Sequence, residues 1–189
     1  VRRLRLLLDR LDASAEIVLV DDGSSDRSYD LMLAAREADS RFKVLRLSRN
    51  FGHQIAITAG MDVAAGNAVI VMDADLQDPP EVVLEMAARW REGFDIIYGV
   101  REARPGETRF KKTTASAFYR LLRRISNIDV PLDVGDFRLV DRRALEAFKA
   151  MRETNRYVRG MFSWIGFRLV GVSFQRDVRF AGSTTSPLT

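Results

Sequence analysis

A chain of 189 residues, of which 47% are hydrophobic, is long enough to form one domain with a sizeable core. The absence of cysteine excludes a disulfide framework and a zinc site built on thiolates. The net charge of +4 is modest, and no apolar run reaches the length of about 18 residues that a membrane span needs.

Apolar residues predict helices and strands that alternate along the first hundred residues. Residues 1–14 have the pattern of an amphipathic helix. Strands are predicted at 17–20, 42–50, 68–75 and 94–101, and helices at 24–39, 52–66 and 78–93. This order predicts an α/β fold with a mostly parallel, Rossmann-like sheet and helices on both of its faces.

The helix predicted at 78–93 carries its own start signals. Asp78 suits the N-cap, Pro79 the first turn and Glu81 the third position of a capping box. We therefore interpret Asp78 as a structural cap.

Polar clusters follow several of the predicted strands. Asp21 and Asp22 follow the first, Asp73 and Asp75 are at the end of the third, and Arg101 ends the fourth. Ligands of open parallel sheets bind outside the carboxyl ends of the strands. Two neighbouring carboxylates repel each other unless a cation lies between them, and oxygen ligands suit Mg²⁺ or Mn²⁺, which also bind substrate phosphates. The pattern predicts a metal–diphosphate site. A turn with a helix cap is the simpler reading of one Asp-x-Asp, but the second acidic pair weakens it.

The excess of basic residues is concentrated between residues 101 and 124. Within it, residues 110–125 place Phe110, Phe118 and Leu121 near one face of a predicted helix, with lysines and arginines around them. Such a helix suits an anionic bilayer surface, although packing on the sheet explains the same pattern. Nucleic acid is not an expected partner, because no platform for base stacking is evident.

Six motifs in this order resemble one enzyme family: VDDGSSDRS, LSRNFGHQIAITAG, MDADLQDPPE, YGVR, DVGDFRLVDRRA and NRYVRGMFSWIGF. Together they resemble the family 2 glycosyltransferases with the GT-A fold. The resemblance is greatest to the branch that transfers a sugar from a nucleotide donor to a polyprenyl phosphate, such as undecaprenyl-phosphate glucosyltransferases and dolichol-phosphate mannose synthase. It extends from residue 16 to about residue 185.

The resemblance implies a donor site at the strand ends. Asp21 and Asp22 match the acids that hold the nucleoside end of the donor. Asp73 belongs to the donor-binding Asp-x-Asp-x-Gln set, in which Asp75 and Gln77 coordinate the metal.

The resemblance also implies residues that act on the phosphates and on the acceptor. Arg101 matches the arginine that approaches the donor phosphates. Asp136 and Arg138 match the catalytic GDFRL motif beside the reacting sugar. Arg156 and Arg159 match the acceptor-binding arginines of the RYxRG segment.

Taken by their pattern alone, several of these residues have simpler interpretations. Arg138 alternates with apolar residues and is compatible with a solvated strand position. Arg156 and Arg159 are compatible with one surface face of a helix. His53, the single histidine, is interpreted as a polar loop residue near the donor rather than as a metal ligand or a catalytic base.

The function that the resemblance implies is a metal-dependent, inverting transfer of a hexose. The expected donor is UDP-glucose, with GDP-hexose as the other nucleotide, the acceptor is undecaprenyl phosphate, and the cofactor is Mg²⁺ or Mn²⁺. The expected location is the cytoplasmic face of the bacterial inner membrane, on an anionic surface. Assembly into a homo-oligomer is left as an open possibility. The alternatives are a soluble family 2 enzyme that acts on a polysaccharide or protein, and a non-catalytic nucleotide-binding module.

The same resemblance predicts that residues 1–189 form a single, partial GT-A catalytic domain. We expect the family's first strand and its C-terminal membrane helices to lie outside these 189 residues. Thr185 and Ser186 stand where the family has Lys-Tyr.

Overall fold

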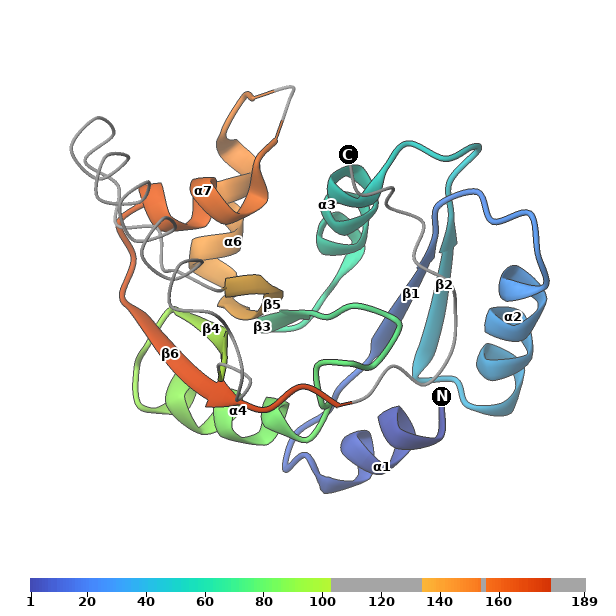
Figure 1. Cartoon of the computed structure of the whole chain (residues 1–189), viewed down its shortest axis with the longest axis horizontal. Helices are drawn as coiled ribbons and strands as arrows, with labels where there is room; N and C mark the ends of the chain where they lie inside the picture. The colour runs from blue at the N-terminus through green and yellow to red at the C-terminus, as the bar shows by residue number, and fades with distance from the viewer. Residues whose placement is uncertain (103–133, 154–155, 178–189) are drawn as a thin grey trace, which may run out of the picture.

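The computed structural model describes residues 1–102, 134–153 and 156–177. Its helices are α1 (Arg2–Arg10), α2 (Ser28–Ala38), α3 (His53–Val63), α4 (Val82–Arg91), α6 (Arg142–Ala150) and α7 (Val158–Trp164). Its strands are β1 (Ile17–Asp21), β2 (Phe42–Arg46), β3 (Ala68–Val71), β4 (Ile96–Arg101), β5 (Val134–Asp141) and β6 (Leu169–Phe174). The predicted alternation of strand and helix is confirmed from α1 to β4 (Figure 1).

The described strands pair in two sheets rather than in the single sheet that we expected. β1 and β2 form a parallel pair, and a four-stranded sheet has the order β3-β5-β4-β6. β4 and β6 are parallel, whereas β5 lies antiparallel between β3 and β4. The alternation pattern contained no signal for this direction, because residues 134–141 lie far along the chain from the strands that they join.

The reversed direction of β5 decides where the site forms. Arg138 of β5 faces Val71 on one side and Tyr98 on the other. The first residues of β5 therefore lie beside the carboxyl ends of β3 and β4. An antiparallel strand thus brings its early side chains to the edge where ligands of parallel sheets bind.

Helices cover both faces of the four-stranded sheet, as the sequence predicts. On one face, α3, α6 and α7 supply a buried cluster that includes Met61, Phe148 and Phe162. On the other face, α1 and α4 pack on Ile97 and its neighbours. Ile96 belongs to the first cluster and Ile97 to the second, because successive strand residues point to opposite faces.

Two sequence predictions lie outside the described residues: the amphipathic helix at 110–125, and the Thr185-Ser186 pair. Of the helices in the part of the chain that the structure describes, none combines the length and hydropathy that crossing a membrane requires.

Candidate active site

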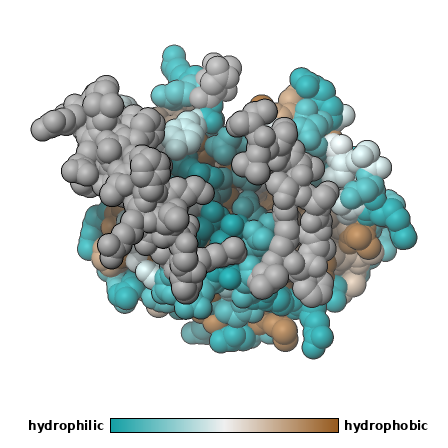
Figure 2. Space-filling view, viewed as in Figure 1, coloured by the Kyte–Doolittle hydropathy of each residue, from teal (hydrophilic) through white to brown (hydrophobic). Residues whose placement is uncertain are grey.

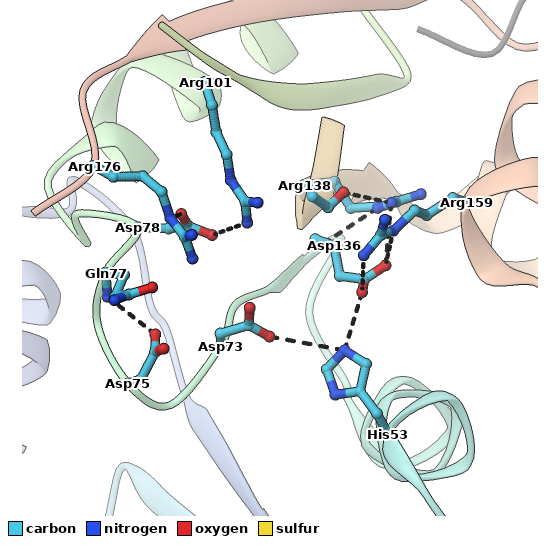
Figure 3. A network of polar contacts seen from close by, with 11 residues as sticks. His53, Asp73, Asp75, Gln77, Asp78, Arg101, Asp136, Arg138, Arg159 and Arg176 are labelled. Carbon is cyan, nitrogen blue, oxygen red and sulfur yellow. Dashed lines mark hydrogen bonds and ion pairs between the residues drawn. The ribbon is translucent and has the colours of Figure 1, made fainter. Parts of the chain in front are cut away.

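A loop rich in carboxylates follows β3, and we call residues 72–81 the acid loop. Its backbone reverses at Leu76, whose φ of 52° is the only positive value of a non-glycine residue in the described chain. The carboxylate of Asp75 accepts a hydrogen bond from the backbone N–H of Gln77 at 3.1 Å. This turn places Asp75 and the side chain of Gln77 next to each other (Figure 3).

Asp73 lies near the start of the acid loop, and its carboxylate faces His53. The distance from Asp73 Oδ1 to His53 Nε2 is 3.8 Å (Figure 3). Burial raises the pKa of Asp73 against the lowering effect of His53, and the carboxylates of Asp78, Asp136 and Asp75 add to the rise. Negative charge is therefore crowded here, and a cation would relieve it.

Asp136, at the start of β5, is enclosed by basic groups. Its side chain is 2% exposed, and its two oxygens accept hydrogen bonds from Nε and Nη2 of Arg159, each at 2.9 Å. His53 Nε2 lies 3.0 Å from Oδ2, and Arg138 Nη2 lies 3.5 Å from Oδ1. Burial acts to raise the pKa of Asp136, but hydrogen bonds from His53 and Arg159 hold it well below its usual range. Asp136 is therefore ionised and poorly suited to accept a proton.

Arg138 lies beneath this cluster. It is 3% exposed and donates hydrogen bonds to the backbone carbonyls of Gly135 and Asp136. Burial lowers its pKa to about 10, so the guanidinium stays charged at neutral pH. The interpretation of Arg138 as a solvated strand residue is wrong. β5 lies between β3 and β4, and successive residues of β5, which point to opposite faces of the sheet, are buried.

The structure separates the two arginines of the RYxRG segment. Arg159 lies in α7 and reaches Asp136, whereas Arg156 precedes the helix. Arg156 donates to the carbonyls of Met151 and Glu153 and stacks on a phenylalanine ring. Sharing one helical face is therefore wrong for this pair, and only Arg159 joins the cluster.

The two acids that follow β1 have different surroundings. Asp21 is buried, accepts a hydrogen bond from Ser24 N–H at 3.0 Å and lies 3.3 Å from Arg46 Nε. Asp22 accepts hydrogen bonds from the backbone N–H groups of Phe51 and Gly52, at 2.7 and 2.9 Å. Asp22 thus fixes the chain just before α3; binding of the donor nucleoside by these acids stays a prediction.

His53 is the site residue whose importance the sequence did not reveal. It is the first residue of α3, not a loop residue, and its ring lies between Asp73 and Asp136. The hydrogen bond that the ring donates to the Asp136 carboxylate raises the pKa of His53. The one available signal was the position of the lone histidine directly after Gly52. Asp22 binds the backbone N–H of Gly52, but a contact between residues 30 positions apart cannot be predicted from a local pattern.

The N-cap prediction for Asp78 is wrong. α4 begins at Val82 with Glu81 at its N-cap, because a turn over Pro79–Glu81 precedes the helix. The Asp78 side chain is instead completely buried and forms ion pairs with Arg101 and Arg176, at 3.4 and 3.0 Å. Arg101, the predicted phosphate-binding residue at the end of β4, therefore reaches the acid loop (Figure 3).

The groups that the structure brings together lie in the middle of one side of the molecule. Figure 1 places the ends of β3 and β5 there, and Figure 2 shows that the visible surface over this region is hydrophilic. Carboxylates of the acid loop thus lie next to the basic groups around Asp136, an arrangement suited to a phosphorylated ligand with its counter-ion.

Comparison with known proteins decides the family. The model of "Glycosyl transferase family 2" matches residues 2–148. The chain belongs to glycosyl transferase family 2. The relatives of this family 2 chain include the uncharacterized glycosyltransferase YkcC of Bacillus subtilis, which is 51% identical over 187 residues. That match covers 99% of this chain and 58% of YkcC.

A second relative has a more specific name. The bactoprenol glucosyl transferase of Shigella phage SfV is 39% identical over 167 residues, which are 88% of this family 2 chain and 54% of that protein. The chain thus spans a little over half the length of the curated relatives that it matches.

A solved structure supports the fold. The mannosyltransferase PcManGT from Pyrobaculum calidifontis, in complex with GDP-Man and Mn²⁺, has a TM-score of 0.63 and 17% identity. It covers 95% of this chain, which covers 52% of it. The expected GT-A fold of this family 2 chain is confirmed.

The acid loop of this family 2 chain can supply part of the coordination shell of a divalent metal, with the rest supplied by a ligand and water. Within the described residues, no group of three or more histidine, cysteine, aspartate or glutamate side chains could hold a metal ion. Asp75 supplies a carboxylate and Gln77 an amide oxygen on one turn. Mg²⁺ commonly takes one or two protein carboxylates and completes its shell with water and substrate phosphates. The residues present therefore fit a metal that binds together with a diphosphate.

Proposed function

We propose that the protein is an inverting glycosyltransferase that transfers glucose from UDP-glucose to undecaprenyl phosphate. The observation that carries this proposal is the contact between the two halves of the site. His53 touches Asp73 of the acid loop and also Asp136, to which Arg159 is bound. An acidic donor side and a basic acceptor side thus share one histidine.

The donor side is the acid loop with its neighbours. Asp75 and Gln77 would hold Mg²⁺ or Mn²⁺, and Asp73 and Arg101 would lie near the donor. The metal supplies neutralisation of the diphosphate, which makes the nucleotide a better leaving group. Asp21 and Asp22 are proposed to contact the nucleoside, from the end of β1.

The acceptor side is the basic cluster around Asp136. Arg159 is 40% exposed, so its guanidinium is accessible while Asp136 fixes its orientation. A phosphate monoester has a second pKa near 6 and is largely dianionic at pH 7. Such an acceptor needs no general base, which agrees with the lowered pKa of Asp136. Arg156 stays a proposed acceptor contact, although in the structure it binds backbone carbonyls.

Relatives support the two substrates separately. The name bactoprenol glucosyl transferase, carried by relatives that are 38 to 40% identical, supports a polyprenyl phosphate acceptor and glucose. The neighbour solved with GDP-Man and Mn²⁺ supports a nucleotide sugar and a divalent metal. Location at the cytoplasmic face of the bacterial inner membrane, on an anionic lipid surface, belongs to the same proposal.

The test is transfer of radiolabel by the full-length protein. UDP-glucose, UDP-N-acetylglucosamine and GDP-mannose are each offered with undecaprenyl phosphate, and in parallel with a soluble oligosaccharide and a protein acceptor. We expect label from UDP-glucose in the lipid fraction. Label only in a soluble acceptor would support the polysaccharide or protein enzyme, and metal-dependent nucleotide binding without any transfer would support a non-catalytic module.

A further inference from the structure

The chain that leaves β6 is fastened to the acid loop. The backbone N–H of Asp177 donates a hydrogen bond to the carbonyl of Gln77 at 2.9 Å. The guanidinium of Arg176 donates to the Asp78 carboxylate at 3.0 Å. Residues 176–177, which we call the β6 anchor, are thus bound to consecutive residues of the loop that carries the proposed metal ligands. Figure 3 shows Arg176 beside Asp78.

The N-terminal helix α1 contacts both the acid loop and the β6 anchor. Arg3 of α1 forms ion pairs with Glu81 at the end of the acid loop and with Asp177, at 2.7 and 2.8 Å. These side chains are between 37% and 47% exposed, so solvent screens the attraction. The buried contact at Asp78 therefore dominates the link between the β6 anchor and the loop.

Asp78 is a demanding group to bury. Its side chain is fully excluded from solvent, and its two oxygens are divided between Arg101 and Arg176. A buried carboxylate that loses a partner has an uncompensated charge, which is strongly unfavourable. The position of Asp78 is consequently tied to the ends of β4 and β6.

The neighbouring backbone shows why such a tie is needed. Leu76 has a φ of 52°, a left-handed conformation that L-residues other than glycine seldom adopt. A strained residue persists only where the surrounding structure holds it. Leu76 lies between Asp75 and Gln77, so relaxation of this one residue would turn the two oxygen ligands away from each other.

We propose that Asp78 and Arg176 are positioning residues that hold Asp75 and Gln77 in their metal-binding arrangement, so that the β6 anchor sets the affinity of the acid loop for a metal-bound nucleotide. This inference rests on the proposed function, because the ligand roles of Asp75 and Gln77 belong to that proposal. It adds a link between the segment after β6 and the donor site.

The experiment compares full-length wild-type protein with Arg176→Gln, Arg176→Lys and Arg89→Gln. Arg89 is the matched control, because it is an arginine on α4 that pairs only with the exposed Glu92 among the described residues. One readout is hydrogen exchange of the metal-free protein at the amides of residues 75–78. The other is the Mn²⁺ concentration that gives half-maximal binding of UDP.

We expect Arg176→Gln to speed exchange at these amides by about tenfold or more and to raise the half-maximal Mn²⁺ concentration by a similar factor. Arg176→Lys keeps the charge, so its exchange rate and its half-maximal Mn²⁺ concentration should lie between those of Arg176→Gln and the wild type. Arg89→Gln should match the wild type in both. Arg176→Lys also serves as the test variant if Arg176→Gln does not fold.

The outcomes separate the inference from the proposed function. Faster exchange over the whole sheet, or faster loop exchange with an unchanged Mn²⁺ requirement, would reduce the anchor to a structural contact and overturn the proposal. Unchanged exchange at residues 75–78 in a folded variant would overturn it too. Wild-type protein that binds no nucleotide at any Mn²⁺ concentration would defeat the proposed function, and with it the metal-binding role of the anchor.

Discussion

The guanidinium of Arg159 binds the carboxylate of Asp136 through two parallel hydrogen bonds, Nε to Oδ1 and Nη2 to Oδ2, each 2.9 Å long. Paired bonds of this kind fix orientation as well as charge. Asp136 is buried and Arg159 is partly exposed, so the buried acid holds an accessible cation in one direction. This relationship supports the proposal that Asp136 arranges the acceptor side of the site and is not a base.

Asp136→Asn should therefore separate turnover from donor binding. The amide keeps the size of the side chain but cannot accept both hydrogen bonds from Arg159. We expect turnover to fall by about 10²-fold or more, the size of loss seen when one positioned electrostatic group is removed. Nucleotide affinity, measured by calorimetry, should stay near the wild-type value. A matching loss of nucleotide affinity would instead place Asp136 in the donor site.

Arg159→Lys should weaken use of the acceptor. Lysine keeps the charge but cannot form the paired contact with Asp136, so its ammonium is not held in one direction. We expect the KM for undecaprenyl phosphate to rise by about tenfold, equivalent to about 1.4 kcal/mol, with the KM for the donor unchanged. Arg152→Gln, at an exposed arginine before α7, is the control. An unchanged acceptor KM in Arg159→Lys would remove Arg159 from the acceptor site.

His53→Gln should reveal a pH-dependent contribution to stability. Contact with Asp136 raises the pKa of His53 above its ordinary value of 6.5. A group whose pKa is raised by folding stabilises the fold fully below its ordinary pKa, and this stabilisation is lost as the pH rises through the folded value. The difference in Tm between wild type and His53→Gln should therefore be larger at pH 5.5 than at pH 9. A difference that grows with pH would mean that the ring is neutral in the fold.

The helices and strands were predictable wherever a local pattern decides them. Strands such as Ile17–Asp21 and Ala68–Val71 are apolar runs with polar residues at or just after their carboxyl ends, so both the strands and the edge of the candidate site could be predicted. The direction of β5 depends instead on pairing with β3 and β4, which lie tens of residues earlier. No local period records such a choice.

The candidate site divides in the same way. Asp73, Asp75 and Gln77 could be proposed from the sequence because they lie within one segment of five residues, 73–77, just after a strand. Asp78 was assigned to a cap because its neighbours fit a capping box, but burial against two distant arginines determines its position. The role of His53 could not be predicted locally, since its partners Asp73, in the acid loop, and Asp136, in β5, lie 20 and 83 residues away in the sequence.

The metal dependence of nucleotide binding tests the central claim, that the acid loop binds a nucleotide sugar through a divalent cation. UDP-glucose is titrated calorimetrically into full-length protein with Mn²⁺ and with EDTA, for wild type and for Asp75→Asn. Carboxylates that face a diphosphate without a cation repel it, so wild type should bind only with Mn²⁺, and Asp75→Asn should lose most of the metal-dependent affinity. Equal affinity with Mn²⁺ and with EDTA in the wild type would contradict the account.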